Sequence, residues 1–176
     1  MNELRNLNLR VSTINVNSMN VSTIGFKNAK TYLKIEGVTS KRPDVILLSD
    51  MRANGKGEEL KKLFNLTHNG NYTLYYNSTK DSRGVGVAIK RNLGHELITR
   101  IDDPEENYLL VKIKVKSTEL LLASVYGPNE NDVGFYNELR RVLNGFGEPK
   151  IIGGDFNTIM DSDRSENNLD LSLIHI

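Results

Sequence analysis

The stretch IIGGDFNTIM, Ile151–Met160, joins an apolar run and two glycines to a short polar segment. In an extended chain, side chains two positions apart point to the same side. Asp155 and Asn157 therefore share one side, and Phe156 anchors the other. A buried strand that ends in this way can hold a proton acceptor and a neutral amide beside one reacting group, so we treat its carboxyl end as a candidate site.

The composition predicts one folded domain. The chain has 176 residues, of which 38% are hydrophobic and 26% charged, and a formal net charge of +1 that neither supports nor excludes a nucleic-acid partner. It has no cysteine, which excludes disulfides and thiolate zinc sites, and its three histidines lack metal-ligand spacing. No apolar run is long enough to cross a bilayer, and the start lacks the apolar core of a signal peptide. We expect an intracellular protein, nuclear or cytoplasmic, that is neither secreted nor bound to a membrane.

Short apolar runs bounded by turn residues predict the elements. Strands are expected at 7–16, 42–50, 71–77, 84–91, 107–115, 120–127 and 150–154, and helices at 29–38, 57–66 and 131–147. The first helix is expected to end near Gly37. In the last, Asp132 is the expected N-cap, and Gly145 or Gly147 the expected end. Helices between strands, with a long run of strands in the middle, predict an α/β or α+β layered domain.

Two local patterns have a structural and a functional interpretation. In VKIKVK, 111–116, strict alternation puts Lys112, Lys114 and Lys116 on one face of a strand, either the solvated outer face of a sheet or a DNA-backbone contact. GVGVA, 84–88, lacks the complete glycine fingerprint of a phosphate-binding loop. We favour a solvated face for the first pattern, and for the second a strand whose small residues permit close packing.

Polar side chains interrupt the apolar runs where several predicted strands end. In layered α/β folds, binding sites form outside the carboxyl ends of strands. Each short motif alone also fits a turn or a helix cap, but together they make an oxygen-rich, histidine-poor set that suits a hard cation such as Mg²⁺ better than zinc. These residues are Asn15, Asn17, Asp50, Tyr126, Asn129, Asp155 and Asn157.

The order of five runs resembles the endonuclease/exonuclease/phosphatase family, and above all the endonuclease domain at the start of non-LTR (long interspersed) retrotransposon polyproteins. The resemblance covers residues 8–166 and implies a four-layer α/β (α+β) sandwich, with two packed mixed β-sheets flanked by helices. The runs are STINVNSMN, DVILLSDMR, SRGVGVAIKR, LLASVYGPN and IIGGDFNTIMDSDRS.

The resemblance implies a metal-binding half of the site. Asp50 stands where the family usually has Glu, the principal metal ligand. Asn15 matches the asparagine that orients this carboxylate, and Asn17 falls where some relatives have a metal-linked side chain. Asp is one methylene shorter than Glu, and Mg²⁺ demands near-ideal geometry at about 2.0–2.1 Å, so Asp50 requires a shifted backbone or an intervening water. Arg52 is a candidate phosphate contact, with an ordinary surface arginine as the alternative.

The resemblance also implies a catalytic half. Asp155 matches the aspartate that activates the attacking water, and Asn157 matches its partner, which holds phosphate or stabilises charge. Tyr126 matches a tyrosine that contacts the scissile phosphate, and Asn129 follows it as a candidate substrate contact. The implied cofactor is Mg²⁺, with Mn²⁺ as the alternative, and the implied substrate is a DNA phosphodiester.

The end of the chain differs from the family pattern. The last six residues, LSLIHI (171–176), correspond to the translation of a transposase adapter end used in sequencing libraries, with a short genuine strand as the alternative. The family's late motifs, including an Asp-His pair, are expected after Asp170. We therefore expect an incomplete domain over 1–170 that is inactive as it stands and exposes apolar sheet surface. The parent polyprotein is expected to continue into a reverse transcriptase.

Three other functions fit the same residues. The parent is alternatively another phosphoesterase of this family, such as an abasic-site nuclease or an inositol-phosphate phosphatase. The substitution at Asp50 and the shortened end also permit a DNA-binding module without catalysis. A structural domain whose strand-end polar residues only cap turns is the third alternative.

Overall fold

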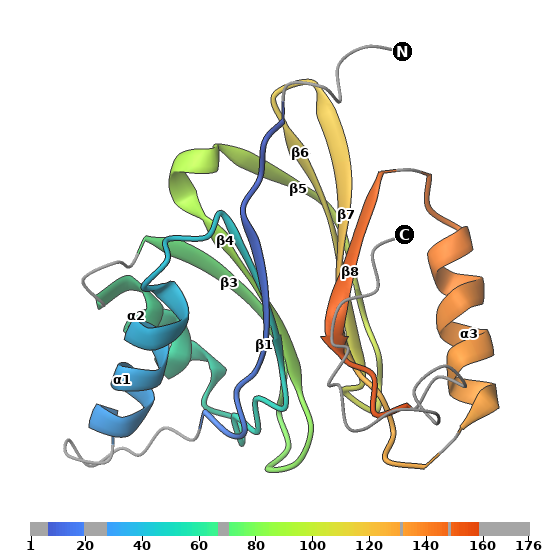
Figure 1. Cartoon of the computed structure of the whole chain (residues 1–176), viewed down its shortest axis with the longest axis horizontal. Coiled ribbons are helices and arrows are strands. Elements are labelled where there is room, and N and C mark those ends of the chain that lie inside the picture. Colours follow the sequence, from blue (N-terminus) through green and yellow to red (C-terminus); the bar gives the residue numbers. More distant parts are fainter. Residues whose placement is uncertain (1–6, 20–27, 67–70, 131, 148, 159–176) are drawn as a thin grey trace, which may run out of the picture.

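The computed structural model describes residues 7–19, 28–66, 71–130, 132–147 and 149–158. Two β-sheets pack face to face, with helices α1 and α2 outside one sheet and α3 outside the other (Figure 1). The helices are α1 (Asn28–Thr39), α2 (Gly57–Leu66), α3 (Val133–Asn144) and the short 3-10 turn η3 (Arg91–Leu93). The strands are β1 (Val11–Asn15), β2 (Val45–Ser49), β3 (Tyr72–Asn77), β4 (Val85–Lys90), β5 (His95–Asp102), β6 (Tyr108–Val115), β7 (Thr118–Tyr126) and β8 (Lys150–Asp155).

Both sheets are mixed. The first has the strand order β1-β2-β4-β3, and the second β5-β6-β7-β8. The pairs β1–β2 and β7–β8 are parallel, and all other pairs are antiparallel. The predicted four-layer sandwich of two mixed sheets flanked by helices is therefore confirmed.

Three apolar layers hold the sandwich together. Buried side chains such as Leu47 and Val87 from the first sheet meet Val111 and Leu122 from the second. The other face of the first sheet packs against α1 and α2, and the other face of the second packs against α3. Burial of apolar surface is the main favourable term in folding, so these layers fix the distance between the sheets and thus between their strand ends.

The two glycines of IIGGDFN allow β8 to approach its neighbours. A Cβ on Gly153 would lie 2.9 Å from Cδ1 of Leu47 and 3.2 Å from Cβ of Thr13, both in the opposite sheet. A Cβ on Gly154, whose φ is 144°, would lie 1.9 Å from the carbonyl oxygen of Val125. A Cβ at Gly153 would displace side chains of the opposite sheet, and one at Gly154 would displace the backbone of β7, so only glycine fits at Gly154. The glycine pair therefore brings Asp155 close to the first sheet.

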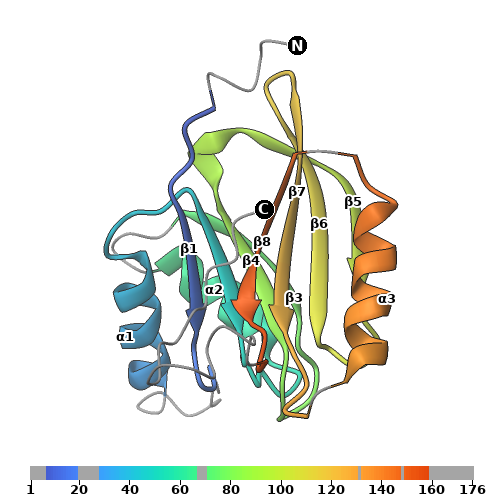
Figure 2. The same cartoon turned by 45° about the vertical axis from the view of Figure 1, so that its right-hand side comes forward.

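Strands from both sheets end at the same edge of the sandwich. The arrowheads of β1, β7 and β8 lie together at one end of the molecule (Figure 2). Because β1 is parallel to β2, with Asn15 opposite Ser49, Asp50 also emerges there. In the second sheet, β7 is parallel to β8, and this pairing puts Tyr126 opposite Asp155. The structure thus gathers at one edge the polar residues that the sequence placed at separate strand ends.

Most predicted elements are present, with three corrections. Strand β1 is shorter than expected, and α1 continues past Gly37 to Thr39. Strand β5 was not predicted: it is an edge strand with no fully buried residue, so it lacks the alternation that marks a half-buried strand. In α3, the Asp132 side chain accepts a hydrogen bond from the backbone N–H of Phe135, and Gly145 is the C-cap, as predicted.

The two local patterns lie mostly in the strands β4 and β6. GVGVA lies largely in β4, where a Cβ on Gly86 would be 2.6 Å from Sδ of Met51, so its small residues do permit close packing. Lys112 and Lys114 lie on β6, and Lys112 pairs with Glu119 at 2.7 Å. Lys116 follows the strand in a turn with φ of 54°, so the prediction that it shares their strand face is wrong.

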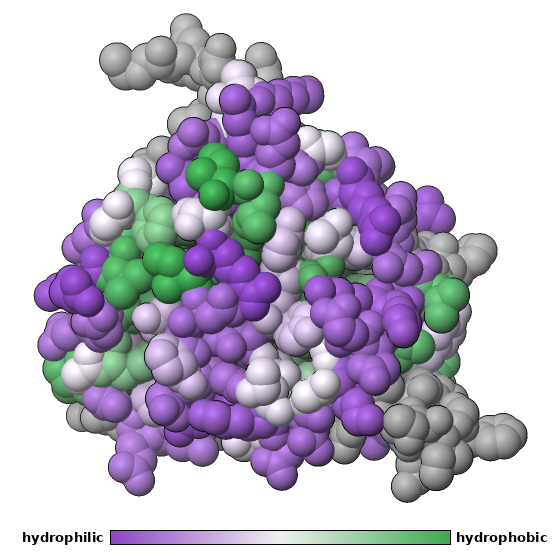
Figure 3. Space-filling model, turned by 180° about the vertical axis from the view of Figure 1, so that it is seen from behind, coloured by the Kyte–Doolittle hydropathy of each residue, from purple (hydrophilic) through white to green (hydrophobic). Residues whose placement is uncertain are grey.

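The described surface carries few large apolar side chains. Hydrophilic residues dominate the face in Figure 3 and separate its smaller hydrophobic groups. Among the described residues, six large hydrophobic side chains are exposed, and three of them lie on the strands β1 and β5. The six are Val11, Leu33, Leu66, Leu97, Ile98 and Val133. No described helix has the length and apolar character needed to span a membrane. The segment 171–176, with its predicted adapter origin, lies outside the described residues.

Candidate active site

A hydrogen bond between the two sheets forms the centre of the site. The side-chain amide of Asn15, at the end of β1, donates to Oδ2 of Asp155, at the end of β8, over 2.7 Å. The sequence predicted that Asn15 orients Asp50. In the structure the carboxylate bonded to Asn15 is Asp155, because Gly153 lets β8 approach β1. An effect of Asn15 on Asp50 stays a prediction.

A second group of bonds fixes the segment after Asp155. The backbone N–H of Asn157 donates to Oδ1 of Asp155 over 3.1 Å, and the Asn157 side chain donates to the carbonyl oxygen of Gly127 over 2.7 Å. Both oxygens of Asp155 thus accept a hydrogen bond, which fixes the plane of the carboxylate. Each oxygen retains acceptor capacity, since a carboxylate offers about four lone-pair sites.

Lys34 of α1 holds the loop after β1. Its ammonium group donates to the carbonyl oxygens of Val16, Asn17 and Ser18 over 2.9, 2.7 and 2.6 Å. Asn17 and Ser18 have φ of 42° and 70°, a left-handed conformation that costs residues other than glycine about 1–2 kcal/mol. Burial, followed by the charge of Lys30, lowers the pKa of Lys34. The backbone N–H of Asn17 donates to Oδ1 of Asn15 over 3.0 Å, so the loop orients the side chain that holds Asp155.

Asp50 forms a two-pronged ion pair with Arg52. Nε of Arg52 donates to Oδ1 of Asp50 over 2.7 Å, and Nη2 donates to Oδ2 over 2.9 Å. The Asp50 side chain is 5% exposed and that of Arg52 is 41% exposed. The hydrogen bond to Asp50 is the main cause that raises the pKa of Arg52, and Tyr126 adds to it.

The backbone that presents this pair is held on both sides. Asp50 and Arg52 have φ of 56° and 46°, and the intervening Met51 is fully buried. The N–H of Met51 donates to Gly84 O over 2.9 Å, and the N–H of Ser18 donates to Asp50 O over 2.9 Å. Because its neighbours fix this strained turn, the turn positions Asp50 and leaves the Arg52 side chain as the freer partner.

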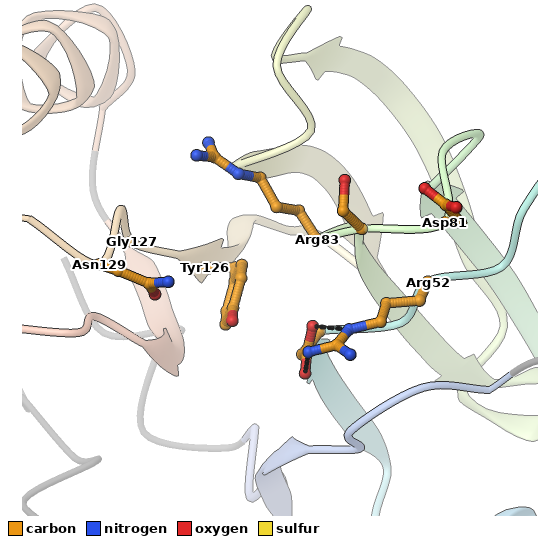
Figure 4. Close-up of a pocket in the computed structure, with 8 residues that line it drawn as sticks. Arg52, Asp81, Arg83, Tyr126, Gly127 and Asn129 are labelled. Atoms are coloured by element: carbon orange, nitrogen blue, oxygen red, sulfur yellow. Dashed lines mark hydrogen bonds and ion pairs between the residues drawn. The ribbon is translucent and has the colours of Figure 1, made fainter.

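A pocket of about 320 Å³ adjoins the ion pair. Tyr126 and Asn129 approach it from the end of β7, and Arg52 lies across from them with its guanidinium turned to Asp50 (Figure 4). The loop between β3 and β4 adds Asp81, Ser82 and Arg83. The lining also includes the carboxylates of Asp50 and Asp81, and Arg52 and Arg83 already donate to Asp50 and Asn107. The Tyr126 hydroxyl and the Asn129 amide are further donors suited to an anionic group such as phosphate.

Sequence reasoning missed the support of this pocket. Asn107 accepts a bond from Nη1 of Arg83 over 2.5 Å at its side chain, and another from the N–H of Tyr126 over 2.6 Å at its carbonyl. The adjacent Glu106 is buried and accepts from the backbone N–H of Thr79 over 2.8 Å. No motif marked these residues, because they act through loops that are distant in sequence. The only local sign was the basic residue of SRG, just before β4.

The chain matches the family model of the endonuclease/exonuclease/phosphatase family over residues 13–175. It belongs to this family. Members of the endonuclease/exonuclease/phosphatase family are hydrolases of phosphoester bonds and generally depend on divalent metal ions. The resemblance noted in the sequence is thus confirmed at the level of the family.

Solved structures of the endonuclease/exonuclease/phosphatase fold agree. The chain is 20% identical to the endonuclease domain of TRAS1, a telomere-specific non-LTR retrotransposon, with a TM-score of 0.53, covering 86% of this chain and 61% of that one. It is 15% identical to an AP endonuclease from Archaeoglobus fulgidus, with a TM-score of 0.60, covering 85% of this chain and 57% of that one. It is 18% identical to D. rerio TDP2 complexed with a single-strand DNA product, with a TM-score of 0.56, covering 88% of this chain and 62% of that one. At these identities the likeness shows the fold, and the chain spans about three fifths of each of these structures.

The donor atoms suit the kind of metal ion that this family uses. Oxygen ligands favour a hard cation, and Mg²⁺ is commonly held by one or two carboxylates together with waters and substrate phosphates. Asp50 is such a carboxylate, and Asn17 lies in the adjacent loop. The described part of the chain contains no group of three acidic or histidine side chains placed to hold a metal ion. The set therefore fits a divalent cation held by a single carboxylate, on condition that Arg52 releases at least one oxygen of Asp50.

The structure brings the predicted site residues to one edge. Asn15, Asn17, Asp155 and Asn157 form one hydrogen-bonded group, which reaches the pocket through Gly127. The others line that pocket and are Asp50, Arg52, Tyr126 and Asn129. Their roles in catalysis and binding remain predictions.

Proposed function

We propose that the chain is the N-terminal part of a magnesium-dependent phosphodiesterase that nicks DNA for a non-LTR retrotransposon. The observation that carries the proposal is the bond of 2.7 Å between Asn15 and Asp155, which links strand ends 140 residues apart. The bond orients a carboxylate at the edge where the other predicted site residues gather. Membership of the phosphoester-hydrolase family supports the same reaction class.

In this proposal Asp155 takes a proton from the attacking water. A general base must be oriented within hydrogen-bonding reach of that water. The bonds from Asn15 and from the N–H of Asn157 orient the carboxylate, and its remaining lone pairs are free to accept the proton. Lys34 is an indirect positioning residue, because it holds the loop that orients Asn15.

The neighbouring pocket would hold the scissile phosphate. Tyr126 and Asn129 donate hydrogen bonds to its non-bridging oxygens, where negative charge grows in the transition state. Asn157 is a neutral donor, and this suits the position because a second carboxylate beside Asp155 would repel phosphate. Asp50 and Asn17 would hold Mg²⁺, or Mn²⁺ in its place, and the bound ion would supply positive charge to the phosphate and to the leaving oxygen.

The retrotransposon assignment rests on motif order and on the TRAS1 domain among the similar structures. It implies a DNA substrate, a downstream reverse transcriptase in the parent polyprotein, and an intracellular site of action in the nucleus or cytoplasm. An abasic-site nuclease or an inositol-phosphate phosphatase would use the same Asp155 and Tyr126 on another substrate.

One observation favours a second function, namely DNA binding without cleavage. Both oxygens of Asp50 are bonded to Arg52, so the expected metal ligand is already paired. A chain in which this pair never opens would retain the pocket as a phosphate-binding surface and lose metal-assisted catalysis.

Plasmid nicking separates these functions. The 176-residue chain, and a version extended by its natural downstream residues to the length of the similar structures, are incubated with supercoiled DNA in Mg²⁺ or in EDTA. The extended version is expected to nick in Mg²⁺ only, and the shorter chain to be inactive. A parallel assay offers inositol phosphates to the same proteins. Release of inorganic phosphate there, without nicking of the plasmid, would favour the phosphatase. DNA retention in EDTA, with no cleavage in either buffer, would favour the binding module.

A further inference from the structure

The Asp50–Arg52 pair has a property that the family resemblance does not account for. A carboxylate that is 5% exposed is neutralised by an arginine only two residues along the chain, through two parallel hydrogen bonds. A buried charge is strongly disfavoured unless it is paired. Arg52 therefore supplies the counter-charge that a metal ion would otherwise supply to Asp50.

We propose that Arg52 is a built-in counter-ion that competes with a divalent cation for Asp50 and so controls access to the metal site. The inference rests on the proposed function for the identity of the metal-binding carboxylate. Metal entry requires at least one of the two bonds from Arg52 to open, because both carboxylate oxygens accept from its guanidinium.

The geometry indicates which partner moves. The turn that carries the pair is fixed by backbone bonds from Met51 to Gly84 and from Ser18 to Asp50, so the carboxylate stays in place. The Arg52 side chain is 41% exposed and lines the pocket beside Tyr126, so it can leave Asp50 without crossing the core. In the pocket the released guanidinium would meet the phosphate of a substrate, an anion that arginine binds well.

The competition has a thermodynamic consequence. A ligand that binds only one of two states is weakened by the population of the other. Removing Arg52 removes the competing state, so it strengthens metal binding at Asp50. It also leaves a buried carboxylate without a partner, so the variant becomes less stable in EDTA and recovers stability when metal is added.

The experiment measures Mn²⁺ affinity and thermal unfolding on the 176-residue chain without substrate. Arg52→Met keeps most of the side-chain volume and removes the charge. We expect it to bind Mn²⁺ about tenfold or more tightly than wild type, equivalent to about 1.4 kcal/mol. Its melting temperature is expected to rise more on addition of Mn²⁺ than that of wild type. Arg52→Lys, which loses the two-pronged contact and keeps the charge, is expected to fall between them.

Two controls locate the effect. Arg141→Met removes a comparable two-pronged pair, with Glu138 on α3, and is expected to bind Mn²⁺ like wild type. Asp50→Asn combined with Arg52→Met is expected to lose the gain in affinity. Equal or weaker Mn²⁺ binding by Arg52→Met, a gain that survives Asp50→Asn, or no binding by any variant would overturn the inference.

The outcome is separable from that of the proposed function. If Arg52→Met binds Mn²⁺ more tightly through Asp50 but the extended protein does not nick DNA, the nuclease proposal fails and the competition stands. If the extended protein nicks DNA in Mg²⁺ while Arg52→Met leaves Mn²⁺ affinity unchanged, the nuclease proposal stands and the competition is wrong.

Discussion

The two carboxylates of the site have different partners. Asp155, at the end of β8, accepts bonds from the neutral amides of Asn15 and Asn157. Asp50, at the end of β2, is buried and paired with the cation of Arg52. Neutral donors orient a carboxylate and leave its negative charge unbalanced, so it can accept a proton. A paired cation balances the negative charge of the carboxylate. The comparison teaches that one half of the site is arranged for use as a base, while the other must first exchange its partner.

The largest effect is expected from removing the available carboxylate. Asp155→Ala should lower single-turnover nicking by the extended protein about 10²–10⁴-fold, the usual contribution of a general base. Arg141→Met, on the outer face of α3, is the control for handling and folding. Undiminished cleavage by Asp155→Ala would remove the distinction between the two halves.

The next effect tests how β8 is brought into place. Gly154→Ala puts a methyl group 1.9 Å from the carbonyl oxygen of Val125, at a φ of 144° that alanine rarely adopts. We expect a loss of about 2–4 kcal/mol in the free energy of unfolding, measured with urea. Gly147→Ala, whose Cβ meets nothing within 4 Å, is the matched control. Equal stability of the two variants would contradict the close approach of β7 and β8.

A smaller loss of stability is expected from changing the loop after β1, which orients Asn15 and through it Asp155. Lys34→Met removes three bonds to backbone carbonyls and should lower the free energy of unfolding by about 1–3 kcal/mol. Urea unfolding measures this, with Lys41→Met, an exposed lysine just after the same helix, as control. If both lysine variants unfold alike, the loop does not depend on Lys34, and the orientation of Asn15 needs another cause.

The smallest effect is expected outside the site, in the contribution of His95 to the pH dependence of stability. Burial lowers the pKa of His95 from 6.5, and its Nε2 lies 3.1 Å from the Tyr75 hydroxyl. Between the lowered pKa and 6.5 the unfolded chain binds more protons, so His95 makes stability fall as pH drops through that window. His95→Gln should reduce the loss of unfolding free energy between about pH 7.5 and about pH 5.5. Identical pH dependence in wild type and variant would rule this out.

Local patterns in the sequence were enough to predict part of the fold. Apolar runs marked the buried strand β2 and the half-buried edge strand β8, and Asp132 marked the start of α3, because apolar runs and caps are read from neighbouring residues. The order of the strand-end residues indicated the site. The prediction that Asp155 and Asn157 share one side of an extended chain is wrong, because β8 ends at Asp155 and Asn157 lies beyond it with φ of 49°. The edge strand β5 was missed because its mostly exposed side chains carry no pattern of burial.

Which groups meet in the site follows from the packing of the two sheets and could not be read from local patterns. The tertiary structure gave the amide of Asn15 to Asp155 and not to Asp50, because the close approach of Gly153 to Thr13 brings β8 beside β1. It joined Arg52 to Asp50 through a left-handed turn that no motif announced. Lys34 and Asn107 joined the site from distant segments for the same reason. Contacts between distant segments depend on the spacing of the packed sheets, and that spacing is a property of the whole core.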